Sequence, residues 1–183
     1  MKAENTALPG VLTVTPRVFE DDRGYFFESY RKHRFEEQGI PFEFVQDNEA
    51  KSEKGVLRGL HYQLRQPQGK LVRVVSGSIL DVAVDIRKGS PNFGQSEMVA
   101  LDSDNRKMLY IPEEGFSHGY LVTSNVAIVT YKCTAGYASD DQYGIIWNDP
   151  SLDIIWGTEN PSLAERDQKW PTLQQQTNLP IYS

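Results

Sequence analysis

The chain has 183 residues, of which 39% are hydrophobic and 11% aromatic, so it can bury a substantial core, and we expect one domain over residues 1–183. The net charge of −6 and the lack of a basic stripe argue against a nucleic-acid binder. No apolar run approaches the roughly 20 residues of a membrane span, and we expect no secretion signal. The single cysteine, Cys133, excludes an internal disulfide and predicts a reducing compartment, the cytoplasm.

The chain predicts many strands and one early helix. Residues 10–19 and 25–30 read as a strand pair joined by the turn residues DDRG. The segment RKHRFEEQG predicts about two helical turns that end at Gly39, with Pro41 just beyond. Further strands are predicted at residues 42–48, 55–63, 70–90 with a break at SGS, 95–101, 107–112, 117–124 and 125–135.

The predicted strands are joined by short turn-forming segments such as QPQG, GSPNFG and DSDN. This spacing favours an all-β sandwich or barrel over βαβ units. Near the C-terminus, PSLAERDQKW predicts a short helix with Ser162 as its N-cap and Glu165 three residues later, within a helix and tail of about 161–183.

Alternation divides the strand ILDVAVDI into two faces. Leu80, Val82, Val84 and Ile86 form an apolar face, which we expect to pack between the sheets. The other face carries Asp81 and Asp85 around a small residue. This second face is either open to solvent, as in many antiparallel sheets, or it lines a polar cavity inside a jelly roll. In VTYKC, the side chains of residues 129, 131 and 133 share one face.

The stretch RGLHYQ places an Arg and a His on one predicted strand. Strict alternation puts Arg58 and His61 on opposite faces. Both can reach one ligand if Gly59 forms a bulge or a close backbone approach. Alternatively, Arg58 reaches around from the rim while His61 points into the barrel.

The sequence gives little support for a catalytic metal site or for a nucleophilic active site. PEEGFSH resembles the second half of the cupin metal motif, but RGLHYQ supplies only His61 for the first half, so His61 and His118 have no evident third ligand. There is no G-x-S-x-G, G-x-G-x-x-G or P-loop. The remaining His, Tyr, Lys and Asp residues suit acid–base chemistry on an already activated carbon.

Several motifs in a fixed order resemble the dTDP-4-dehydrorhamnose 3,5-epimerases, a family of the cupin superfamily. They span nearly the whole chain, from about residue 10 to about residue 173, and are DDRGYFFESY, FVQDN, GVLRGLHYQ, QGKLVRVVSGSILDVAVDIRKGSPNFG, YIPEEGFSHGY, YKCTAGY, IIWNDPSLDIIW and LAERDQKWP. The resemblance implies a cupin jelly roll with a few short helices. It also implies inversion at C3 and C5 of a dTDP-4-keto-6-deoxyhexose in dTDP-L-rhamnose biosynthesis, a precursor route for cell-surface polysaccharides.

The implied chemistry uses no cofactor and no metal, because both carbons are α to the C4 ketone and their protons are acidic enough for a side chain to remove. The resemblance implies a homodimer as well. By resemblance, His61 is the base, Asp167 its carboxylate partner, Tyr131 the proton donor and Lys70 the group beside the enolate oxygen. The implied substrate contacts are Arg58 at the diphosphate, His118, Gln46, Asp47, Asn48, Gln142 and Arg166, with Arg23 and Glu28 supplied by the other subunit.

The chain departs from the family pattern at a few binding positions. Gln142 stands where many relatives carry Glu, and Ala164 and Arg166 stand in a segment that often reads L-S-x-K-D. We also expect Asp81 or Asp85 to orient His118. The alternatives are an epimerase that acts at only one carbon, a metal-dependent cupin, and a sugar-nucleotide-binding cupin without catalysis.

Overall fold

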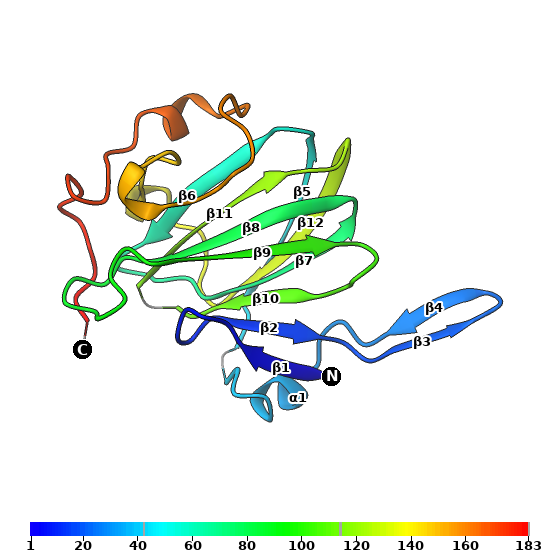
Figure 1. Cartoon of the computed structure of the whole chain (residues 1–183). Helices are drawn as coiled ribbons and strands as arrows, with labels where there is room; N and C mark the ends of the chain where they lie inside the picture. Colours follow the sequence, from blue (N-terminus) through cyan, green and yellow to red (C-terminus); the bar gives the residue numbers. More distant parts are fainter. Residues whose placement is uncertain (42, 114, 183) are drawn as a thin grey trace.

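Two antiparallel sheets face each other in the computed structural model, which describes residues 1–41, 43–113 and 115–182. The first sheet has the order β1-β2-β10-β7-β12-β5 and the second the order β13-β6-β11-β8-β9. Figure 1 shows them as two layers, with a separate β3-β4 hairpin that projects from one end. The first sheet consists of β1 (Lys2–Asn5), β2 (Leu12–Thr15), β10 (Met108–Ile111), β7 (Lys70–Ser76), β12 (Val126–Cys133) and β5 (Gln46–Glu53). The second consists of β13 (Gln142–Gly144), β6 (Leu57–Gln63), β11 (Phe116–Val122), β8 (Ser78–Asp85) and β9 (Ser96–Asp102).

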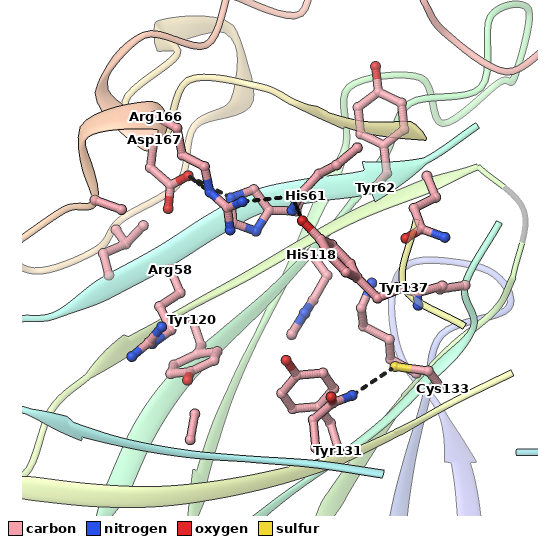
Figure 2. Close-up of a pocket in the computed structure, with 18 of the residues that line it drawn as sticks. Arg58, His61, Tyr62, His118, Tyr120, Tyr131, Cys133, Tyr137, Arg166 and Asp167 are labelled. Carbon is pink, nitrogen blue, oxygen red and sulfur yellow. Dashed lines mark hydrogen bonds and ion pairs between the residues drawn. The ribbon is translucent and has the colours of Figure 1, made fainter. Parts of the chain in front are cut away.

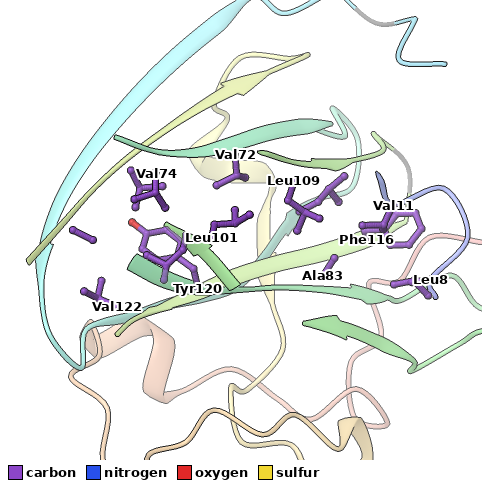
Figure 3. Packing of buried hydrophobic residues seen from close by; sticks show 14 residues of the cluster. Leu8, Val11, Val72, Val74, Ala83, Leu101, Leu109, Phe116, Tyr120 and Val122 are labelled. Atoms are coloured by element: carbon purple, nitrogen blue, oxygen red, sulfur yellow. The ribbon is translucent and has the colours of Figure 1, made fainter. Parts of the chain in front are cut away.

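The main core fills the space between the two sheets (Figure 3). Val72 of β7 and Val129 of β12 meet Ala83 of β8 and Val122 of β11, and all four are at most 1% exposed. Burial of apolar side chains from both inner faces is what holds two such layers together. The alternating pattern thus predicted the fold class correctly, an all-β sandwich of the jelly-roll kind.

The apolar face of β8 packs elsewhere than we expected. Val82, Val84 and Ile86 lie on the outer side of the second sheet, against Leu152 and Trp156 of the C-terminal segment. The prediction that this face packs between the sheets was wrong, because the chain after β13 folds back over the sheet and covers its outside (Figure 1). The carboxylate-bearing face therefore points inward, where Asp81 and Asp85 are both 0% exposed, so the solvent alternative for that face is wrong.

The local elements at both ends of the chain differ in detail from the prediction. The early helix is α1 (Lys32–Glu36), followed by Gly39 with φ +83°. The hairpin consists of β3 (Val18–Asp21) and β4 (Gly24–Phe27), while β2 pairs with β1 and β10. The strand predicted at 42–48 begins only at residue 46, and residue 42 lies outside the described residues.

The predicted C-terminal helix is only a short 3-10 turn, η3 (Glu165–Gln168). Ser162 is not its N-cap. Instead the Ser162 backbone forms a parallel bridge with Val56, accepting from Leu57 N over 2.9 Å and donating to Gly55 O over 2.8 Å. Two further 3-10 turns are η1 (Ser139–Asp141) and η2 (Pro150–Leu152). Within the described residues, no helix is long and apolar enough to cross a bilayer.

Candidate active site

A cavity of about 480 Å³ opens between the two sheets beneath the C-terminal segment. Figure 2 shows side chains from both sheets converging on it. Its lining includes ten of the thirteen residues that the sequence singled out, namely Gln46, Asn48, Arg58, His61, Lys70, His118, Tyr131, Gln142, Arg166 and Asp167.

His61 of β6 pairs with Asp167 of η3 at the cavity wall. His61 Nε2 lies 2.7 Å from Asp167 Oδ1, and the carboxylate also accepts from Trp170 Nε1 over 3.3 Å. A carboxylate without a proton can only accept, so Nε2 carries the hydrogen and the lone pair lies on Nδ1. The side chain of Asp167 is only 3% exposed. The pair thus sets the tautomer that a base requires.

The pKa values of this pair suit a neutral imidazole beside an ionised carboxylate. Burial lowers the pKa of His61 and outweighs the hydrogen bond with Asp167, which raises it. Burial on its own raises the pKa of Asp167, but the hydrogen bonds and charge of His61, together with Trp170, bring that pKa below its usual value. His61 can therefore accept a proton near neutral pH.

The strand β6 departs from regular alternation at Gly59. The pairing with β11 joins His61 to His118 and Arg58 to Tyr120, with a register shift between the two pairs. As a result Arg58 and His61 both line the cavity. Leu57, Leu60 and Tyr62 belong to the outer cluster, although Leu57 and Tyr62 also border the cavity. The irregularity predicted at Gly59, as a bulge or a close backbone approach, is confirmed.

Gly59 allows this irregularity because it has φ +137° and lies against the neighbouring backbone. A Cβ at this position would lie 2.5 Å from Gly119 Cα and 2.9 Å from His118 O. We expect Gly59→Ala to lower the free energy of unfolding by about 2–4 kcal/mol, measured by urea denaturation. The matched control is Gly157→Ala, since Gly157 has φ +76° but no atom within 4 Å of the added carbon. Equal losses in both variants would contradict the role of close packing.

His118 of β11 forms a second pair, with Asp81 of β8. The two side chains are 8% and 0% exposed, and His118 Nε2 lies 2.7 Å from Asp81 Oδ1. This confirms the expected contact between His118 and a carboxylate of β8. The other candidate, Asp85, is instead bound by Arg87 and Ser90.

Tyr131 and Lys70 face this wall from the other sheet. Tyr131 and Cys133 share the inward face of β12, as alternation predicted, and Val129 packs beside them in the core. Burial is the main cause that raises the pKa of Tyr131, so its hydroxyl keeps its proton at neutral pH. Burial likewise lowers the pKa of Lys70, against the charges of Cys133 and Asp81. Either protonation state of that amine donates hydrogen bonds.

Three of the predicted binding residues lie outside the cavity. Asp47 of β5 pairs with Lys132 over 2.9 Å on the opposite face of the first sheet. Arg23 lies in the β3-β4 hairpin and binds Asp21, whereas Glu28 just after the hairpin pairs with Arg31 and Arg34. Within one chain, then, the structure does not bring Arg23, Glu28 or Asp47 to the site.

Several lining residues were not predicted from the sequence. Tyr120 follows His118 by two positions on β11, so alternation could have placed it on the same face. Tyr137 lies in the quoted motif YKCTAGY, but a loop offers no periodicity to assign its direction. Gln63 and Gln68 also line the cavity. Trp170, which holds Asp167, had no sequence signal because its partner is recognisable only in the fold.

The arrangement places an imidazole paired with a carboxylate on one sheet, and a tyrosine hydroxyl and a lysine amine on the other. Among the described residues, no group of three or more His, Cys, Asp or Glu side chains is arranged to hold a metal ion. Proton transfer to and from a carbon acid that lies between the sheets is the chemistry that these groups can perform.

Comparison with known proteins identifies relatives over almost the entire chain. A family model described as dTDP-4-dehydrorhamnose 3,5-epimerase matches residues 5–175. The chain is 51% identical to the dTDP-4-dehydrorhamnose 3,5-epimerase of Pseudomonas aeruginosa, over 92% of this chain and 94% of that protein. It is 46% identical to the enzyme of the same name from Methanothermobacter thermautotrophicus, over 97% and 95% of the two chains.

Solved structures of relatives have the same fold. The 3,5-epimerase of Legionella pneumophila, determined in complex with dTDP-4-keto-L-rhamnose, superposes with a TM-score of 0.96 at 44% identity, covering 100% of this chain and 98% of that one. A 3'-monoepimerase from Streptomyces bikiniensis, in complex with dTDP-quinovose, gives a TM-score of 0.90 at 33% identity, covering 97% and 92%. With the matched model and these identities, the chain belongs to the dTDP-4-dehydrorhamnose 3,5-epimerase family, as its motifs predicted.

Proposed function

We propose that the protein inverts the configuration at C3 and C5 of dTDP-4-dehydro-6-deoxy-D-glucose, producing dTDP-4-dehydro-L-rhamnose for dTDP-L-rhamnose biosynthesis. The observation that carries the proposal is the His61–Asp167 pair on one sheet opposite Tyr131 and Lys70 on the other, in one cavity of a chain from this family. The free, buried Cys133 supports a reducing compartment such as the cytoplasm as the place of action.

In the proposed mechanism His61 removes the proton from C3 or C5. The resulting negative charge spreads onto the C4 oxygen, because both carbons are α to the ketone. Asp167 stabilises the imidazolium that forms. Tyr131 then returns a proton from the opposite side of the sugar ring, and inversion follows from the two groups lying on different sheets.

Lys70 supports this reaction by donating a hydrogen bond to the enolate oxygen. Lys70 as a residue is 8% exposed, so the interaction takes place where water competes little. His118 also lies on the cavity wall, with Nε2 bound to Asp81, so its Nδ1 donates to the substrate only in the imidazolium form. We assign Lys70 to the developing charge at C4.

The nucleotide is bound by polar and cationic groups nearer the opening. Arg58 is held by Ser52, whose Oγ accepts from Arg58 Nε over 3.2 Å and from Nη2 over 3.1 Å. We propose that Arg58 and Arg166 bind the diphosphate, since guanidinium groups suit phosphate oxygens. Gln46 and Asn48, joined by a 2.9 Å hydrogen bond, are the proposed nucleoside contacts.

A homodimer would complete the site with residues that one chain leaves outside it. The β3-β4 hairpin exposes Phe19, Tyr25 and Phe26 by 53%, 55% and 71%, which is unusual for aromatic side chains of a lone chain. We propose that this hairpin packs on a second copy and brings Arg23, with neighbouring Glu28, to the partner's nucleotide. Sedimentation equilibrium tests the dimer, and a monomer at micromolar concentration would contradict it.

The reaction predicts exchange of two carbon-bound protons with solvent. Incubation with dTDP-4-dehydro-6-deoxy-D-glucose in heavy water should place deuterium at both C3 and C5, detected by NMR and mass spectrometry. The similarity to a 3'-monoepimerase makes a one-carbon reaction the second candidate. Label at a single carbon would identify that alternative, and no label at either carbon would contradict epimerisation.

A further inference from the structure

Side-chain hydrogen bonds cross the mouth of the cavity, and Gln142 is at their centre. Tyr137 Oη donates to Gln142 Oε1 over 2.9 Å, and Arg166 Nη1 donates to the same oxygen over 2.8 Å. An amide oxygen has two lone pairs, so these two bonds fill its capacity. Tyr137 lies in the loop after β12 and Arg166 in η3, so Gln142 of β13 joins segments that are far apart in the chain.

The same hydrogen-bond network extends to the proposed nucleoside contacts on one side of the cavity and to the His61–Asp167 pair on the other. On one side Tyr137 N donates to Gln46 Oε1 over 2.9 Å, next to the proposed nucleoside contacts. On the other side Arg166 Nε lies 3.5 Å from Asp167 Oδ1, the oxygen that pairs with His61. Gln142 therefore stands between the nucleotide end and the proton-transfer end.

We propose that Gln142 is a positioning residue whose neutral amide holds Tyr137 and Arg166 across the mouth and leaves the positive charge of Arg166 available to the substrate's phosphates. This inference rests on the proposed function. A carboxylate at position 142 could accept the same two hydrogen bonds, but it would pair with Arg166 and cancel its charge. In a protein of net charge −6, a local positive charge matters for attracting an anionic nucleotide sugar.

The neutral amide also affects the base. Burial is the main cause that lowers the pKa of His61, and the charge of Arg166 lowers it further. A carboxylate beside Arg166 would offset that second contribution and raise the pKa. The ionisable groups that share the cavity with His61 come from its own strand and from every element that faces it. They are Arg58 and Tyr62 of β6, Asp167 and Arg166 of η3, Lys70 of β7, His118 and Tyr120 of β11 with Asp81 of β8 behind His118, Tyr131 and Cys133 of β12, and Tyr137 of the loop that follows.

Two substitutions at one position separate charge from geometry. Gln142→Glu keeps two acceptor sites and adds a negative charge, whereas Gln142→Met keeps the length and removes the acceptor. For Gln142→Glu we expect KM to rise roughly 2- to 5-fold, with a smaller change in kcat, and the rise to shrink at high salt. The acid limb of kcat/KM should move to higher pH. For Gln142→Met we expect a higher KM that salt does not correct, and an acid limb at the wild-type position.

A second measurement needs no turnover. The chain has only three histidines, so the titration of His61 can be followed by NMR in the free protein and assigned with His61→Asn. Its pKa should rise in Gln142→Glu and stay at the wild-type value in Gln142→Met. Gln174→Glu is the control, since it adds the same charge at an exposed position outside the cavity.

Each outcome bears on one proposal only. If the wild-type protein incorporates no deuterium from heavy water into the substrate, the proposed function fails, while the NMR titration still tests the link between Gln142 and His61. If the wild type is active but Gln142→Glu titrates and binds like wild type or like Gln174→Glu, the role of the neutral amide is overturned. A rise of KM in Gln142→Glu that equals the rise in Gln142→Met at every salt concentration would also overturn it.

Discussion

His61→Ala should lower kcat for epimerisation by about 10²- to 10⁴-fold, because it removes the group that takes the proton from carbon. Affinity for dTDP should stay near the wild-type value, since the proposed nucleotide contacts Gln46, Asn48 and Arg58 are untouched. Deuterium exchange at C3 and C5 should fall in parallel with turnover. Single-turnover assays by NMR, together with calorimetric titration of dTDP, measure both quantities.

The matched control for this variant is His33→Ala. His33 lies on α1 with a side chain 77% exposed, and it is not among the residues that line the cavity. It should keep wild-type activity. Full activity in His61→Ala would exclude His61 as the base, and loss of dTDP binding together with turnover would assign it to binding instead.

Tyr131→Phe should separate proton exchange from net inversion. The base remains, so exchange of the substrate's protons should continue, whereas formation of the inverted product should fall by about 10²-fold or more because the opposite sheet no longer supplies a proton. The phenyl ring fills nearly the same space, so stability should change little. Solvent exchange and product formation are followed in one NMR experiment in heavy water.

Tyr143→Phe is the matched control for this second variant. Tyr143 is stacked on Tyr62 with ring centroids 5.8 Å apart, packs against the outer cluster of the second sheet, and does not itself line the cavity. It should leave both exchange and inversion at wild-type rates. Equal loss of exchange and inversion in Tyr131→Phe would contradict the assignment of Tyr131 as the acid.

Local sequence patterns predicted the strands well, because alternation and turn residues act over a few neighbours. The same patterns could not tell which apolar face of β8 is covered by the other sheet and which by the C-terminal segment, because that depends on where residues 145–173 return in space. Ser162 shows the same limit, since a serine before Glu165 suits a helix start, yet its backbone pairs with β6 instead.

The sequence predicted those site residues that lie within recognisable family motifs. His61, Asp167, Tyr131 and Lys70 lie together as the resemblance implied, although they are far apart in the sequence. Trp170 and the hydrogen bonds of Gln142 were out of reach, because they arise from contacts between segments whose spacing is set only by the complete fold. Gly59 is an intermediate case. A glycine within a strand predicted an irregularity, and the structure shows it as a register shift in the pairing of β6 with β11.

Because the proposed base and the proposed acid lie on different sheets, the proposed stereochemistry depends on the thickness of the core between the sheets. His61 is attached to one layer and Tyr131 to the other, and the gap between them is filled by side chains such as Val72 and Ala83. A larger side chain at Ala83, which is 0% exposed, would push the layers apart and lengthen the path of the second proton without touching substrate. The apolar core of this sandwich therefore sets the separation between His61 and Tyr131, and the sugar ring must fit within that separation.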